Sequence, residues 1–256
     1  MSRDKRITVS IIASMVDSTL LKKDASVNEI QRMCGHAVNN GVGAICVYPE
    51  HMHAAYDQIE ETPVKLIGVV GFPHGTGSIK DKCLSAERRM LDGADELDMV
   101  MNLELFLDRR YKPVLRDIEA VIDAARSNPS RRGLADKTVV KVIIESALLE
   151  DEGKRLDLPD GILINDAAKI VGDAGGDFVK TSTGMHPSGG VRKGHVALIK
   201  SVISGEVGVK ASGGIRTWDH VKELLIEGAM RFGTSSAEII LEELAREIGD
   251  EAFIEL

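Results

Sequence analysis

The chain has 256 residues, of which 43% are hydrophobic and 28% charged, and its formal net charge is −8. This composition is typical of a globular protein with a sizeable core. The acidic balance argues against nucleic acid as the main partner, because phosphate backbones select basic surfaces. No apolar run approaches the ~18 residues that span a bilayer, and the start of the chain does not resemble a signal peptide. The three cysteines are widely spaced and no metal-ligand spacing is present, so we expect a cytoplasmic protein without a disulfide framework or a bound metal.

Short apolar or β-branched runs alternate along the chain with longer stretches of helical period. The predicted strands are Ser14–Ser18, Ala44–Val47, Lys65–Val70, Glu96–Met101, Val139–Ile144, Phe178–Thr181, Gly208–Ala211 and Arg231–Gly233. The predicted helices are Val27–Asn40, Ile79–Gly93, Pro113–Ser127, Ile162–Ala174, Gly194–Ser204, Thr217–Glu227 and Ala237–Gly249. Glycines follow several of these helices, as is usual where a helix ends in a left-handed residue.

This alternation predicts parallel strands joined by crossover helices. Eight such units in about 250 residues match the size of a (β/α)8 TIM barrel. A doubly wound open sheet is the alternative, but the early G-x-G-x-x-G fingerprint of a dinucleotide-binding fold is absent. No composition shift or low-complexity linker divides the chain, so we expect a single α/β barrel domain over residues 1–256.

Two lysines lie near the ends of consecutive predicted strands, where the active sites of such barrels are found. They are Lys180 in D-F-V-K-T-S-T-G and Lys210 in V-G-V-K-A-S-G-G-I-R. Burial disfavours the ammonium form, and two lysines in one cavity would repel each other's protons and leave one amine neutral near pH 7. A neutral amine is a nucleophile toward carbonyls. The alternative for either lysine alone is a side chain that reaches the barrel mouth or binds a substrate phosphate. The residues leave open which lysine would be the nucleophile.

Charged residues also occupy two of the inner predicted strands. Alternation places Glu96 and Asp98 on one face of their strand, and Lys141 and Glu145 on one face of the next. One interpretation is a buried ion pair between Lys141 and Asp98. The other is a carboxylate that moves protons and sets the pKa of a catalytic lysine, and the two are compatible.

Two glycine-bearing turns follow the seventh and eighth predicted strands. They are S-G-G-I-R (Ser212 to Arg216) and F-G-T-S-S (Phe232 to Ser236). Many barrels bind phosphate at these positions, on backbone N–H groups and a helix N-terminus. We expect Ser235 and Ser236 to cap the last helix and to leave N–H groups free for an anion. Ordinary strand-to-helix turns are the alternative.

Taken together, the motifs resemble the deoxyribose-phosphate aldolase family over nearly the whole chain. The segments that carry the resemblance are V-D-S-T-L (Val16 to Leu20), A-I-C-V-Y-P (Ala44 to Pro49), G-F-P-H-G (Gly71 to Gly75), G-A-D-E-L-D-M-V (Gly93 to Val100), K-V-I-I-E (Lys141 to Glu145), F-V-K-T-S-T-G (Phe178 to Gly184), K-A-S-G-G-I-R-T (Lys210 to Thr217) and R-F-G-T-S-S (Arg231 to Ser236). So many matches in order make chance similarity improbable.

The resemblance implies a lyase of the class I aldolases, on a (β/α)8 barrel and without metal or cofactor. Such an enzyme reversibly cleaves 2-deoxy-D-ribose 5-phosphate to acetaldehyde and D-glyceraldehyde 3-phosphate through a lysine Schiff base, in deoxyribonucleotide catabolism. It also implies a homodimer or homotetramer. The alternatives are a Schiff-base aldolase for a longer sugar phosphate and a non-catalytic barrel that only binds sugar phosphates.

Site residues follow from the same resemblance. It implies that Lys180 forms the Schiff base, that Lys210 perturbs its pKa, that Asp98 handles protons and that Lys141 supports them. The implied phosphate site consists of Gly184, Gly213, Gly214, Gly233, Ser235 and Ser236.

The chain departs from the family pattern at two places. Many members have a lysine where Met185 stands, so we expect another cation, Arg216, to contact the phosphate. Some members end in a tyrosine implicated in proton transfer, whereas the last tyrosine here is Tyr111. Proton transfer would then fall to Asp98, the lysines and water.

Overall fold

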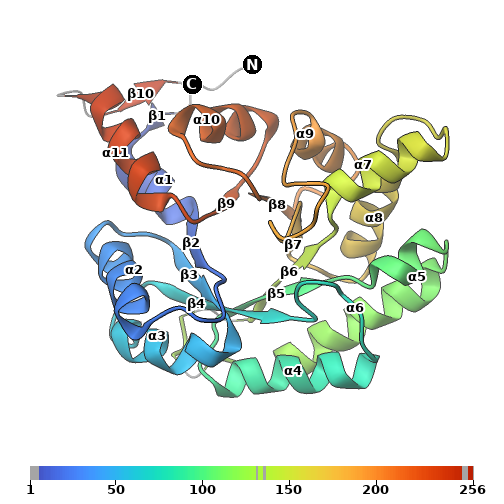
Figure 1. Cartoon of the computed structure of the whole chain (residues 1–256), viewed down its shortest axis with the longest axis horizontal. Helices are drawn as coiled ribbons and strands as arrows, with labels where there is room; N and C mark the ends of the chain where they lie inside the picture. The colour runs from blue at the N-terminus through green and yellow to red at the C-terminus, as the bar shows by residue number, and fades with distance from the viewer. Residues whose placement is uncertain (1–5, 131, 135–136, 250–252, 256) are drawn as a thin grey trace.

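A computed structural model describes residues 6–130, 132–134, 137–249 and 253–255, and eight of its strands form a closed parallel barrel surrounded by helices (Figure 1). The barrel strands are β2 (Val16–Leu20), β3 (Ala44–Val47), β4 (Lys65–Val70), β5 (Glu96–Val100), β6 (Val139–Ile143), β7 (Phe178–Lys180), β8 (Gly208–Ser212) and β9 (Arg231–Thr234). Each strand pairs with the next in chain order, and β9 closes the barrel on β2. The predicted (β/α)8 fold is confirmed.

Helices follow the strands and form the outer layer of the molecule. They are α1 (Val9–Met15), α2 (Val27–Asn39), α3 (Met52–Ile59), α4 (Ile79–Leu91), α5 (Leu103–Leu107), α6 (Tyr111–Arg126), α7 (Ser146–Arg155), α8 (Ile162–Asp173), α9 (His195–Lys200), α10 (Trp218–Glu227) and α11 (Ala237–Ile248), with a 3-10 turn at Pro49–His51. Side-chain caps define several starts. In α2, for example, Ser26 and Glu29 form a reciprocal capping box.

The structure corrects the predicted elements at the start of the chain and at several short helices. Ser14 and Met15 belong to α1, so the first barrel strand begins at Val16 and not at Ser14. The helices α1, α3, α5 and α7 were not predicted. Both α3 and α7 start without a side-chain cap, so the usual sequence signal of a helix start is missing there. The helix α5 has only five residues, which is too short to show a helical period.

Strand alternation divides the buried apolar side chains into two layers. One set, such as Ile45 and Val47 of β3, packs against the surrounding helices in the main core. The other set faces the barrel interior, where Ala44, Cys46 and Ile67 form part of a small separate cluster from β3 and β4. A network of charged side chains also occupies the interior, as described below.

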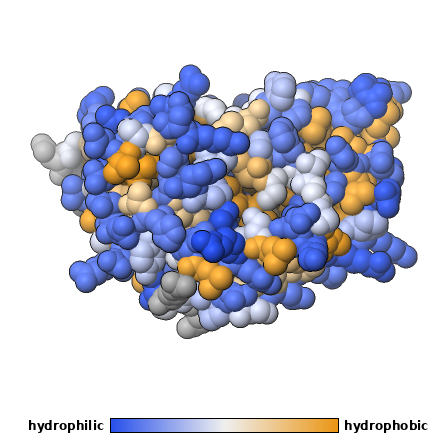
Figure 2. Space-filling model, turned by 60° about the horizontal axis from the view of Figure 1, so that its bottom comes forward, coloured by the Kyte–Doolittle hydropathy of each residue, from blue (hydrophilic) through white to orange (hydrophobic). Residues whose placement is uncertain are grey.

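Outside the barrel, the short strands β1 (Arg6–Ile7) and β10 (Ile254–Glu255) pair antiparallel beside α11 (Figure 1). Hydrophilic residues cover most of the face shown in Figure 2, and the hydrophobic ones lie there in small separate groups. Within the described ranges, no helix combines the length and the apolar character needed to cross a bilayer.

Candidate active site

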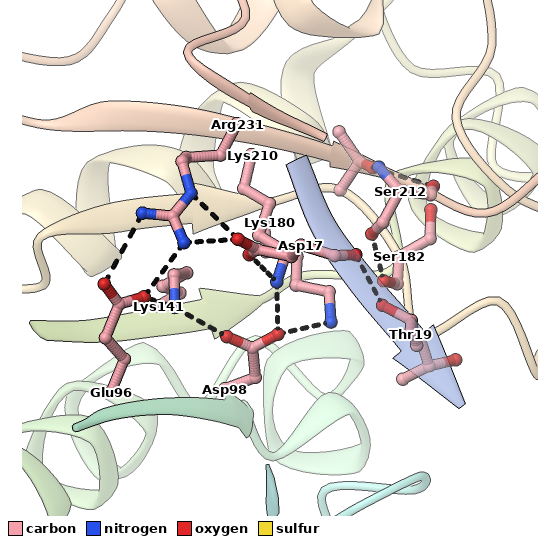
Figure 3. Close-up of polar contacts among 12 residues, drawn as sticks. Asp17, Thr19, Glu96, Asp98, Lys141, Lys180, Ser182, Lys210, Ser212 and Arg231 are labelled. Carbon is pink, nitrogen blue, oxygen red and sulfur yellow. Dashed lines mark hydrogen bonds and ion pairs between the residues drawn. The ribbon is translucent and has the colours of Figure 1, made fainter. Parts of the chain in front are cut away.

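The register of the strands aligns the predicted site residues in two neighbouring pairs. Lys180 of β7 pairs with Lys210 of β8, and Asp98 of β5 pairs with Lys141 of β6. Paired residues of neighbouring parallel strands point to the same side of the sheet. All four side chains therefore enter the barrel interior together (Figure 3).

Asp98 is the centre of this cluster, because its carboxylate contacts three lysines. The Nζ atoms of Lys180 and Lys210 each lie 2.7 Å from Asp98 Oδ2. The Nζ of Lys141 lies 3.1 Å from Asp98 Oδ1 and 2.5 Å from Glu96 Oε2. The ion pair predicted between Lys141 and Asp98 is thus present, and the same carboxylate also joins the two strand-end lysines.

A second group of charges extends the cluster toward β2 and β9 (Figure 3). Asp17 Oδ2 lies 2.6 Å from Lys210 Nζ, and Asp17 Oδ1 accepts hydrogen bonds from the guanidinium of Arg231. Arg231 also donates to Glu96, with Nη2 at 3.2 Å from Oε2. Sequence reasoning assigned no role to Asp17 or Arg231, because nothing local links two residues that lie 214 positions apart in the chain.

The buried groups of this network do not balance if all are charged. The carboxylates are Asp17, Glu96 and Asp98, and the basic side chains are Lys141, Lys180, Lys210 and Arg231. One further lysine, Lys65, reaches Glu96 from the rim and is partly exposed to water. Arginine stays protonated in proteins, so the excess positive charge is relieved when one lysine loses its proton.

The contacts select Lys180 as that lysine. Burial lowers the pKa of Lys180, and the charge of Lys210 adds to the lowering against the opposing effect of Asp98. Burial also acts on Lys210, but its two carboxylate partners, Asp17 and Asp98, outweigh burial and raise the pKa of Lys210 above its usual range. Although burial favours the protonated carboxyl, the three lysines hold the pKa of Asp98 well below its usual value.

A cavity of about 360 Å³ opens above this network at the carboxyl ends of the strands. Its lining residues are Thr19, Leu20, Leu21, Lys22, Lys180, Thr183, Gly184, Met185, Ser212, Gly213, Gly214, Ile215, Arg216, Gly233, Thr234 and Ser235. Of the three lysines that contact Asp98, Lys180 lines the cavity, whereas Lys141 and Lys210 are completely buried beneath it. The two strand-end lysines thus differ in access as well as in charge.

The predicted phosphate-binding glycines lie on the other wall of the same cavity. Gly184, Gly213 and Gly214 all have left-handed backbones, with φ of 80°, 87° and 78°. At Gly213 a side chain would also collide with the backbone, because a Cβ there would lie 2.6 Å from the Cα of Gly190. These turns therefore need glycine, and they bring backbone close to whatever occupies the cavity.

The last predicted turn is only partly as expected. Ser235 lines the cavity, but Ser236 is not among its lining residues. Ser236 stands at the start of α11 without a capping bond from its side chain, and its N–H donates to Thr234 Oγ1 at 2.9 Å. The prediction that these serines cap the helix with their side chains was wrong, since Ser236 alone stands at the cap position and makes no such bond. The Ser236 N–H is also not free for an anion, because the Thr234 hydroxyl accepts it.

Two cations stand at this wall, of which the sequence predicted one. Arg216, for which a phosphate contact is predicted, lines the cavity, and so does the exposed Met185. Lys22, which follows β2, lines it as well and pairs with Glu29 at 3.3 Å. Its position just after a strand end is the signal that would have identified it. The cavity thus has an amine at its base and an anion-compatible wall beside it.

Comparison with known proteins identifies the family. The model of the DeoC/LacD family aldolases matches residues 11–237. A deoxyribose-phosphate aldolase from Caldicellulosiruptor saccharolyticus is 37% identical over 237 residues, which cover 93% of this chain and 100% of that protein. The deoxyribose-phosphate aldolase from Thermococcus kodakarensis is 39% identical over 90% of this chain and 96% of its own. The tetrameric structure of deoxyribose phosphate aldolase from Aeropyrum pernix matches with a TM-score of 0.79 at 30% identity, covering 94% of this chain and 92% of that one. The chain therefore belongs to the DeoC/LacD aldolase family.

Proposed function

We propose that the chain is a class I deoxyribose-phosphate aldolase, a lyase that reversibly cleaves 2-deoxy-D-ribose 5-phosphate to D-glyceraldehyde 3-phosphate and acetaldehyde. The observation that carries the proposal is Lys180, a buried amine of lowered pKa that lines the cavity 2.7 Å from Asp98. Such an amine is a nucleophile toward an aldehyde. The family and the names of the relatives support the choice of substrate.

Catalysis begins when the neutral Nζ of Lys180 attacks C1 of the open-chain sugar. Loss of water gives an iminium ion, whose cationic nitrogen accepts the electron pair of the bond between C2 and C3. Lys210 remains protonated between Asp17 and Asp98, and its charge keeps the pKa of Lys180 low. The two lysines therefore have different roles although they share one carboxylate oxygen.

Asp98 handles the proton that this cleavage releases. Through a bridging water it accepts the proton of the C3 hydroxyl as the bond breaks and glyceraldehyde 3-phosphate leaves. Because three lysines hold the pKa of Asp98 well below its usual value, the carboxylate relays this proton rather than keeping it. Protonation of the remaining enamine at C2 and hydrolysis of the iminium release acetaldehyde and restore Lys180. General acid–base assistance of this kind contributes typically ~100- to 10,000-fold. Lys141 holds Asp98 from its other oxygen.

The cavity wall that carries Gly184, Gly213 and Gly214, here called the glycine wall, is where the substrate phosphate would bind. We infer that backbone N–H groups at Gly184, Gly213, Gly214, Gly233 and Ser235 bind it, while Ser236, whose N–H already donates to Thr234 Oγ1, begins the last helix beside them. Arg216 and Lys22 supply positive charge at the mouth, in place of the lysine absent at Met185. A dianionic phosphate is stabilised by such donors and charges.

We further infer that residues 1–256 form one barrel domain, and that the protein acts in the cytoplasm in deoxyribonucleotide catabolism. We also infer assembly into a homodimer or homotetramer, which the tetrameric relative from Aeropyrum pernix supports. Light scattering of the purified protein measures this directly, and a monomeric mass would contradict it.

The function is tested by coupling deoxyribose 5-phosphate cleavage to the reduction of its triose phosphate product. Borohydride added with substrate should trap one covalent adduct, on Lys180, which peptide mass spectrometry identifies. An adduct on Lys210 would reverse the assigned roles, and no adduct with no cleavage would reject the aldolase. Comparing acetaldehyde with dihydroxyacetone as the donor in synthesis distinguishes this activity from that of aldolases for longer sugar phosphates.

A further inference from the structure

Glu145 has an unusual backbone and an unusual environment for an acidic residue. It connects β6 to α7 in the left-handed region, with φ 53° and ψ 59°. A residue other than glycine, asparagine or aspartate is strained there, by about 1–3 kcal/mol. Its side chain is 1% exposed. A strained backbone and a buried acidic side chain at one position indicate that Glu145 has a specific structural or functional role.

The carboxylate of Glu145 contacts the loop that carries the first phosphate-binding glycine. Its Oε1 accepts a hydrogen bond from the backbone N–H of Thr183 at 2.7 Å. Thr183 and Gly184 both line the cavity, and the chain reaches them directly from Lys180. A hydrogen bond to a buried carboxylate is stronger than one between neutral groups, so this contact fixes the loop firmly.

The remaining contacts around Glu145 anchor the same loop at both ends. The N–H of Ser146 donates to the carbonyl of Thr181 at 2.8 Å, just before Thr183. At the far end of the loop, Nδ1 of His195 lies 2.8 Å from the hydroxyl of Ser146. The turn that begins α7 therefore holds the β7–α9 loop at its start and at its end, and Glu145 bonds to the residue directly before Gly184.

We propose that Glu145 is a positioning residue that sets the preference for phosphorylated substrates. By accepting the hydrogen bond from the Thr183 N–H, its carboxylate fixes the backbone that leads from Thr183 to Gly184. This contact thereby places the glycine wall at the distance a phosphate requires. Its second oxygen, Oε2, is buried without a hydrogen-bond partner among the described residues. The contact to Thr183 is thus the side chain's main interaction, and removing it affects this loop first. The inference rests on the proposed aldolase function and on the phosphate-binding role of the glycine wall.

The test compares deoxyribose 5-phosphate with 2-deoxyribose, which lacks the phosphate, in three variants. Glu145→Asn tolerates the left-handed backbone but is too short to reach Thr183. Glu145→Gln keeps the length and an acceptor oxygen. Asp157→Asn is the matched control, since Asp157 is an exposed acid with φ 52° just beyond the other end of α7.

For Glu145→Asn we expect KM for deoxyribose 5-phosphate to rise about tenfold, the loss of one positioned hydrogen bond, with a much smaller change in kcat. Cleavage of 2-deoxyribose should change by less than about threefold, and inorganic phosphate should inhibit that cleavage about tenfold more weakly. Glu145→Gln should restore most of the affinity, and Asp157→Asn should resemble the wild type.

Equal losses with both sugars would overturn the proposal, as would a glutamine variant that is no better than asparagine. If Glu145→Asn does not fold, Glu145→Asp carries the same shortening with the charge retained and should show the same preference loss. A wild-type protein that cleaves neither sugar would instead reject the proposed function, so the two failures are distinct.

Discussion

Two buried lysine–aspartate pairs in this molecule share their local geometry but differ in surroundings. In the barrel, Lys180 Nζ lies 2.7 Å from Asp98. Between α4 and α6, which pack side by side, Lys82 Nζ lies 2.6 Å from Asp117 and 3.1 Å from the carbonyl of Val100. Both lysines are almost fully buried, and burial lowers the pKa of both.

The difference between the pairs lies in access and in the number of partners. Lys82 is covered by the Gly71 turn, whereas Lys180 lines the cavity. Among the described residues Asp117 pairs with one cation, and its pKa is raised by burial against the pull of Lys82. Asp98 contacts three lysines, and its pKa is lowered. A buried lysine with a lowered pKa is therefore not by itself a nucleophile. Lys180 differs from Lys82 in having an open face and a second lysine, Lys210, whose charge lowers its pKa further.

The largest effect should come from Lys180→Arg. The guanidinium keeps the positive charge but cannot form a Schiff base, so we expect cleavage to fall by roughly 10,000-fold or more. The coupled assay measures this, with thermal unfolding as a check of the fold. Lys222→Arg, the same exchange in an ion pair on α10, should retain wild-type activity. Appreciable turnover in Lys180→Arg would remove the Schiff-base mechanism.

The Lys82–Asp117 pair, which is covered from the cavity, should show the opposite pattern, a loss of stability with activity kept. Lys82→Met leaves the Asp117 carboxyl buried without its partner, so we expect the free energy of unfolding to fall by about 3–5 kcal/mol. Urea denaturation measures this loss, and kcat should stay within about threefold because Lys82 is outside the cavity. The double variant with Asp117→Leu should recover most of the stability. A single variant as stable as the wild type would contradict the assignment of Lys82 to the core.

A smaller effect tests the charge that separates the two lysines of the barrel. Lys210→Met removes a positive neighbour of Lys180 and leaves more of the negative charge of Asp98 to act on it. Both changes favour the ammonium form, so the pKa of Lys180 should rise and the neutral amine should appear only at higher pH.

The pH profile of borohydride trapping on Lys180 measures this shift. The midpoint should move upward and the rate near pH 7 should fall several-fold, while Lys210→Arg should keep the midpoint closer to that of the wild type. An unchanged or lower midpoint would mean that Lys210 does not control the reactivity of Lys180.

The barrel and its lysine pair could be predicted because the signals are local. Eight short apolar runs separated by helical stretches fix the order of a parallel barrel, and Lys180 and Lys210 stand at equivalent ends of neighbouring strands. The sequence pattern left open which lysine is the nucleophile, and only the family resemblance implied Lys180. The structure adds a physical reason, since Asp17 pairs with Lys210 and not with Lys180.

Other features depend on contacts that no local pattern encodes. Arg231 and Asp17 are 214 residues apart in the chain and meet only because the barrel closes. Lys82 stands in a polar stretch of α4 and looks like an exposed helical lysine until α6 covers it. Glu145 could be placed at a strand end, but its left-handed backbone and its bond to Thr183 become visible only in three dimensions.

The charged interior of the barrel has a further consequence for the response to heat. Removing the charges of Asp17, Glu96 and Arg231 from water opposes folding. The hydration of charged groups becomes less favourable as temperature rises, because it carries a strongly negative entropy. The network therefore costs least stability when the protein is hot and most when it is cold. The same charges that tune the amine therefore favour warm working conditions.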